Sequence, residues 1–162
     1  MNRIIENIRS ISGVIASLLL VTMFGSFLLQ IFFRYIMGWS VGWTIEYVSI
    51  AWLWIILFGY AFVVRENDVI KLDILYAYLP EKTKRVFDFF TNLICGMILI
   101  LSLPKSIDYI EFMSIERTAY LRINFALLFS IYVPFAVVVS FRCLLNAWNA
   151  LKGKGYEAEF EV

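Results

Sequence analysis

Charged and strongly polar side chains within or beside long apolar segments are the residues of this sequence that could do chemistry. Arg34, Glu46 and Asp88 are the charged candidates, and Gln30 is the strongly polar residue deep in the first apolar run. In a membrane protein such groups bind substrates, relay protons or hold coupling ions. Each charge lies about one helical turn from the end of its segment, however, so its side chain can also reach the aqueous interface. No acidic residue is expected at mid-membrane depth, which argues against a proton or sodium site.

Arg34 and Glu46 stand on either side of a short turn at residues 37–42, with aromatic side chains between them. Opposite charges that bracket a turn can pair and thereby hold the two segments that the turn joins. We therefore expect Arg34 and Glu46 to interact across this turn and to fix the first two apolar segments as a hairpin.

Other chemistries are disfavoured by what the sequence contains. Histidine is absent, which removes haem anchoring by paired histidines, most zinc sites and any Ser-His or Cys-His machinery. Cys95 and Cys143 are expected at different membrane depths, so no disulfide is predicted between them. The formal net charge is +1, and the small basic cluster at 82–85 is offset by nearby acidic residues, so no nucleic-acid contact is expected. The sequence thus predicts no catalytic residue, no cofactor and no metal site.

The composition indicates an integral membrane protein. Hydrophobic residues make up 62% of the chain and charged residues 17%, and the mean hydropathy is +0.80. Crossing a bilayer core takes about 20 apolar residues in helical form, and in lipid a lone chain with such segments must be helical. The predicted fold is all-α, a single four-helix transmembrane domain over 1–150 in contact with the lipid bilayer, with spans at about 10–34, 43–64, 86–104 and 123–145.

The connections add further expectations. Apolar residues at helical spacing predict a short amphipathic helix at about 69–79, lying in the membrane interface and ending near Pro80. Residues 105–122 are expected to form either a helical extension of the third span or a second surface helix. Pro134 should kink the fourth span, because it removes a backbone donor and crowds the carbonyl four residues earlier. Residues 151–162 are expected to be a flexible tail.

The distribution of Lys and Arg predicts the orientation. Ten of the 14 lie on the side that holds both termini and the connection between the second and third spans. By the positive-inside rule, both termini are expected in the cytoplasm.

The order of marker residues resembles the small membrane subunit of tripartite ATP-independent periplasmic (TRAP) transporters. The similarity covers about 30–145, with departures at Ile45, Val69 and Asn124, where many members carry an acidic residue, His and Pro. The matching residues are Gln30, Arg34, Tyr35, Trp43, Glu46, Trp54, Gly59, Arg65, the Ile70-Lys71-Leu72-Asp73 element, Leu79-Pro80 and Pro134.

This resemblance implies a three-part uptake system in the bacterial inner membrane. A periplasmic substrate-binding protein would capture an organic acid, such as a C4-dicarboxylate or a sialic acid. A large membrane transport subunit would carry the acid across with sodium ions. The small subunit would have no catalytic role, and would brace the large one and help to dock the binding protein.

Other functions remain open from the residues alone. A self-sufficient four-helix exporter working as a homodimer would need a membrane-embedded carboxylate, and Glu46 is the candidate, although it lies near the end of its span. A thiol-oxidising membrane enzyme would need adjacent cysteine pairs, which this sequence lacks. A haem or quinone anchor would need histidines.

Overall fold

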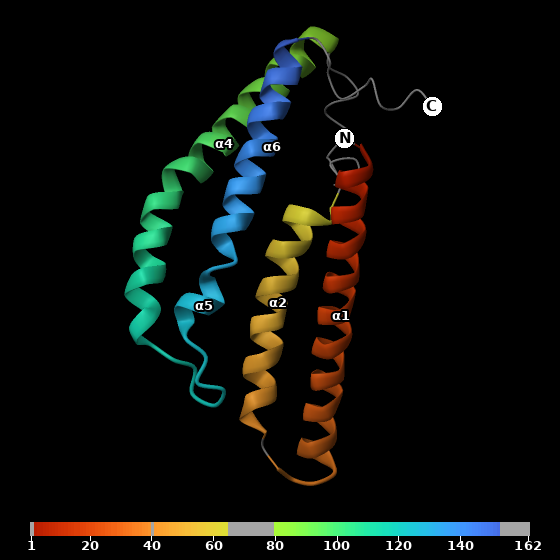
Figure 1. The fold of residues 1–162 in the computed structure, drawn as a ribbon, viewed down its shortest axis with the longest axis vertical. Coiled ribbons are helices and arrows are strands. Elements are labelled where there is room, and N and C mark those ends of the chain that lie inside the picture. Colours follow the sequence, from red (N-terminus) through yellow and green to blue (C-terminus); the bar gives the residue numbers. More distant parts are fainter. Residues whose placement is uncertain (1, 40, 65–79, 153–162) are drawn as a thin grey trace. The chain divides into compact units, whose positions relative to one another are not determined.

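The computed structural model describes residues 2–39, 41–64 and 80–152, without the side chains of residues 2–5 and 81. Within these ranges the regular elements are helices, together with an isolated bridge between Arg117 and Asn124. Figure 1 shows the order along the chain, which is α1 (Asn2–Tyr35), α2 (Gly42–Phe62), α4 (Glu81–Phe112), the 3-10 turn η2 (Met113–Ile115), α5 (Phe125–Phe129) and α6 (Tyr132–Leu151).

Four helical segments are long and apolar enough to cross a membrane, which confirms the prediction of an all-α protein with four spans. They cover Glu6–Tyr35, Gly42–Phe62, Lys82–Ile115 and Phe125–Leu151. The predicted interfacial helix at 69–79 lies outside the described residues, as does nearly all of the predicted tail.

The third helix extends beyond Pro104, which bears out the first of the two alternatives predicted for residues 105–122 as far as Phe112. Instead of ending at Pro104, α4 continues through this proline to Phe112, so residues 105–112 extend the third span as a helix. A proline inside a helix removes one backbone hydrogen bond, and a membrane helix tolerates this where hydroxyl groups lie close by. The carbonyl that loses its donor is that of Ile100, whereas the hydroxyls of Ser102 and Ser106 donate to the neighbouring carbonyls of Leu99 and Ser102, at 2.8 and 2.9 Å.

The fourth span is broken where a kink was predicted. α5 ends at Phe129 and α6 begins at Tyr132, with Pro134 in its first turn. Because the first turn of a helix has no backbone acceptor for its N–H groups, a proline there costs little. The proline therefore lies just after an interruption instead of bending a continuous helix.

The chain divides into two compact units. The first comprises residues 1–65 and 107–135, and the second comprises residues 66–106 and 136–162. In the first unit, α1 and α2 pack side by side as the predicted hairpin (Figure 1). The Tyr47 hydroxyl on α2 donates to Thr22 Oγ1 on α1 at 2.7 Å, which links the two helices within the apolar zone.

In the second unit, Gly96 of α4 lies against α6. A Cβ added to Gly96 would stand 3.3 Å from the Cβ of Cys143, and the Ser140 carbonyl is also near. Small residues allow such a close approach of two membrane helices. Cys95 and Cys143 therefore lie at similar depth, which corrects the sequence-based expectation. The cause is that α6 continues to Leu151, past the predicted end of the fourth span at about 145, so Cys143 lies further from the end of its helix than expected. Both cysteines are free thiols.

Candidate functional site

Glu46, the carboxylate nearest to the turn between α1 and α2, binds backbone amides from a distant loop. Its Oε1 accepts from the N–H of Tyr120 and its Oε2 from the N–H of Leu121, both at 2.9 Å. The structure thus gives this carboxylate a different partner from the Arg34 guanidinium that the sequence suggested. Arg34 is exposed at the end of α1. Two charge-assisted bonds to adjacent amides make Glu46 an anchor for the loop.

The loop that Glu46 holds, residues 113–124, is ordered by its own hydrogen bonds. The N–H of Thr118 donates to the carbonyl of Ile123 at 2.9 Å, and the N–H of Ile123 donates to Thr118 Oγ1 at 3.0 Å. Arg122 has a φ of 53°, in the left-handed region that tight turns often require. Thr118 is buried in this arrangement.

Asn124 connects the loop to the helix that follows. Its Oδ1 accepts from the N–H of Ala126 at 2.8 Å, which is the typical cap of a helix N-terminus. Its Nδ2 donates to the carbonyl of Ser114 at 2.8 Å. Asn124 stands where the resembling family often has proline. Here the amide side chain both starts α5 and closes the loop.

Gly42, the first residue of α2, touches the loop through a ring. The Tyr120 side chain occupies the space that a Cβ on residue 42 would fill. A larger residue at this position would have to displace the Tyr120 ring. Together with the Glu46 bonds, this contact fastens the loop to the first turns of α2. We call the arrangement of Gly42, Glu46, Tyr120 and Leu121 the loop clasp.

Trp54 stabilises the break in the fourth span. Its indole Nε1 donates to the carbonyl of Leu128 at 3.1 Å. In an uninterrupted helix this carbonyl would accept from the N–H of residue 132, but α5 ends at Phe129. A carbonyl without a donor is costly in lipid, and the indole gives this one a donor directly before the interruption. Trp54 and Pro134, two of the family marker residues, therefore both lie at the interruption between α5 and α6.

The other end of α2 is also held by a side chain. The Nε of Arg9, on α1, donates to the carbonyl of Val63 at 3.1 Å, directly after the last residue of α2. A cation at a helix C-terminus satisfies a free carbonyl and interacts well with the helix dipole. The sequence analysis used Arg9 only as one of the basic residues that predict the membrane orientation.

The remaining predicted residues lie apart from these contacts. Gln30 is half-buried on α1, and Tyr35 and Trp43 are exposed near the turn. Gly59 faces open space, with no atom within 4 Å of an added Cβ. Arg65 and Asp73 lie outside the described residues. Pro80 precedes α4, and its carbonyl accepts from Thr83 and Lys84.

The described residues contain no group of three His, Cys, Asp or Glu side chains that could hold a metal ion. The side chains that do come together form hydrogen bonds to backbone groups. The sequence analysis missed the loop as the partner of Glu46. Asn124, a typical residue for a helix start, was the one signal that a turn closes there.

Comparison with known proteins confirms the family resemblance that the sequence suggested. No curated protein matches the chain. A family profile described as the DctQ component of tripartite ATP-independent periplasmic transporters matches residues 8–153, nearly the whole chain. The chain therefore belongs to the DctQ family, the small membrane component of TRAP transporters.

Proposed function

We propose that this chain is the non-catalytic small subunit of a sodium-driven TRAP system that takes up an organic acid. It braces the large transport subunit and helps to dock the periplasmic substrate-binding protein. The substrate is an organic acid such as a C4-dicarboxylate or a sialic acid, and the other subunits select it. The family membership is shown by the profile match, and the proposal adds the role that this subunit has within the transporter.

The loop clasp is the observation that carries this proposal. A self-sufficient exporter would need Glu46 as a free carboxylate that exchanges protons or ions during transport. Both of its oxygens instead hold backbone amides of Tyr120 and Leu121. A carboxylate that fastens a loop has a structural task, as expected in a subunit that shapes a surface and moves no solute.

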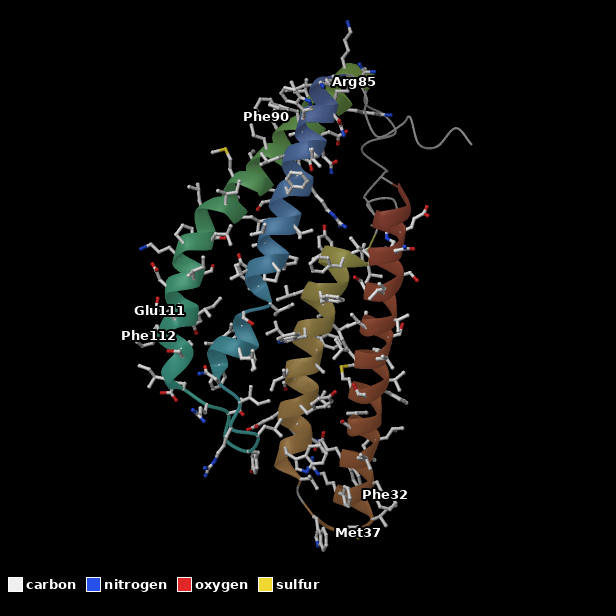
Figure 2. The ribbon with its side chains drawn as sticks, viewed as in Figure 1. Phe32, Met37, Arg85, Phe90, Glu111 and Phe112 are labelled. Carbon is white, nitrogen blue, oxygen red and sulfur yellow. The ribbon has the colours of Figure 1, made fainter. Side chains whose placement is uncertain are left out.

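The loops at this end of the first unit support the docking role. Tyr35, Trp39 and Tyr120 are exposed there, and so is the cation Arg122. Figure 2 labels Phe32 and Met37 at the same end, where both side chains point away from the ribbon. Aromatic and arginine side chains are enriched in protein interfaces. A loop pre-ordered by hydrogen bonds also loses little entropy when a partner binds.

The proposed location is the bacterial inner membrane, with both termini in the cytoplasm. This orientation puts the loop clasp on the periplasmic side, where a binding protein could reach it. Fusions of a periplasm-active phosphatase to residue 152 and to residue 117 test it. We expect activity only from the fusion at 117, and the reverse pattern would refute the orientation.

Affinity purification tests the role as a subunit. The tagged chain, extracted in mild detergent from membranes that express the large subunit, should retain that subunit in a fixed stoichiometry. Glu46→Gln should leave this retention intact, because the carboxylate acts within the chain. Purification of the chain as a homodimer free of any larger membrane protein would favour the exporter instead.

A further inference from the structure

A narrow stripe of α2 faces away from the neighbouring helices of the first unit. Its members are spaced alternately four and three residues apart, so they lie on one face of the helix. Three of them are large and exposed, and the other two are small. They are Ile45, Ser49, Trp52, Ile56 and Gly59, which we call the α2 stripe.

Trp52 lies at the centre of this stripe and of the helix. It is ten residues from each end of α2, which is about 15 Å from either end of the span. Tryptophan in membrane proteins prefers the two interfaces, where its N–H meets water or headgroups. Trp52 is 59% exposed at mid-membrane depth instead. Its depth therefore requires an explanation other than interfacial anchoring.

Among the described residues of the first unit, the indole N–H of Trp52 has no acceptor. Trp54, two residues further on, shows the usual situation, because its indole donates to Leu128. Hydrocarbon chains offer no acceptor, so lipid alone would leave the Trp52 donor unsatisfied. A polar group from another protein would satisfy it. This separates the α2 stripe from the many purely aliphatic exposed surfaces of the chain.

Two small residues make room for such a partner. The Ser49 hydroxyl already donates to the carbonyl of Ile45 at 3.0 Å, within its own helix, and so adds no unsatisfied polar group. Gly59 has no atom within 4 Å of an added Cβ. Small residues let the backbone of a second helix approach closely in a membrane. Trp52 projects between these two positions as a large anchor.

We propose that the α2 stripe is the contact surface for a transmembrane helix of the large transport subunit. That helix presents a backbone carbonyl or hydroxyl oxygen to the Trp52 indole at mid-membrane depth. Its backbone lies close to α2 at Ser49 and Gly59. The inference rests on the proposed function for the existence of the large subunit and names the face that meets it.

Photo-cross-linking in the full complex tests the proposal. The photoreactive residue p-benzoylphenylalanine replaces Trp52 in one chain and Phe24 in a control chain. Phe24 is a matched position, because it is an aromatic residue on α1, 58% exposed and at similar depth. We expect the yield of adduct with the large subunit to be at least about fivefold higher from position 52.

Three outcomes would overturn the inference while the complex still purifies intact. They are equal yields from the two positions, adducts of position 52 with a second copy of this chain, and adducts within the chain. If the unmodified chain does not retain the large subunit at all, the proposed function fails first. The two failures are therefore distinguishable.

A second measurement tests the acceptor itself. Trp52→Phe keeps an aromatic ring and removes only the indole donor. We expect the half-life of the complex in detergent to fall about threefold, which matches an average interhelical hydrogen bond in a membrane. Phe24→Leu should leave the half-life unchanged. An unchanged half-life for Trp52→Phe would show that no acceptor faces the indole.

Discussion

Replacing Trp54 with Phe tests how the broken fourth span is stabilised. The change keeps an aromatic ring and removes the donor that lies 3.1 Å from the Leu128 carbonyl. Interhelical hydrogen bonds in membranes average about 0.6 kcal/mol and reach about 1.7 kcal/mol. A buried carbonyl left without a donor costs about 1–3 kcal/mol. Because Leu128 is only partly buried, we expect a loss of about 1–2 kcal/mol in the free energy of unfolding.

The assay is unfolding of the isolated chain by sodium dodecyl sulfate in mixed micelles, followed by circular dichroism. Trp52→Phe is a matched control, since it makes the same chemical change two residues away at an indole without an acceptor among the described residues of the first unit. This control should stay within about 0.5 kcal/mol of the wild type. Equal losses in the two variants, or no loss in Trp54→Phe, would refute the reasoning.

A double-mutant cycle with Pro134→Ala sharpens the same test. Alanine restores a backbone donor at residue 134, whose helical acceptor is the Ser130 carbonyl, and so permits α5 and α6 to join into one helix that needs less support from the indole. Trp54→Phe should then cost less in the Pro134→Ala background than in the wild type. Strictly additive losses would mean that the indole does not compensate for the interrupted helix.

The loop clasp and the second contact at the end of α2 give three further expectations. Gly42→Ala should displace the Tyr120 ring and speed tryptic cleavage of the 113–124 loop severalfold, whereas Gly59→Ala, in open space, should not change it. Glu46→Gln should speed the same cleavage by a smaller factor, since the amide retains one acceptor, and unchanged cleavage would contradict the anchoring role. Arg9→Gln should lower the free energy of unfolding by about 0.3–1 kcal/mol through the free carbonyl at the end of α2, measured in the same mixed micelles.

The four spans could be predicted because lipid imposes a simple rule on any chain. Each segment must be about 20 apolar residues long and must satisfy its own backbone, so hydropathy locates the helices. The details at the prolines could not be predicted in the same way. Pro104 lies inside α4 and Pro134 follows an interruption, and hydropathy does not distinguish these two outcomes.

The candidate site shows a different limit. A carboxylate near a turn suggests a cationic partner, so Arg34 was the natural expectation for Glu46. The actual partners are backbone amides 74 and 75 residues further along the chain, and every residue except proline has such an amide. Sequence type therefore carries no information about them. The resemblance marked Trp54 as important, but only the structure supplies its bond to Leu128.

The central claim, that this chain is a structural subunit and no transporter by itself, is tested most directly by sodium-driven uptake into proteoliposomes. Vesicles should contain this chain alone, the large subunit alone, or both, with the binding protein and a radiolabelled organic acid outside. We predict uptake only where both membrane subunits are present with a sodium gradient. Uptake by vesicles that hold this chain alone would contradict the account.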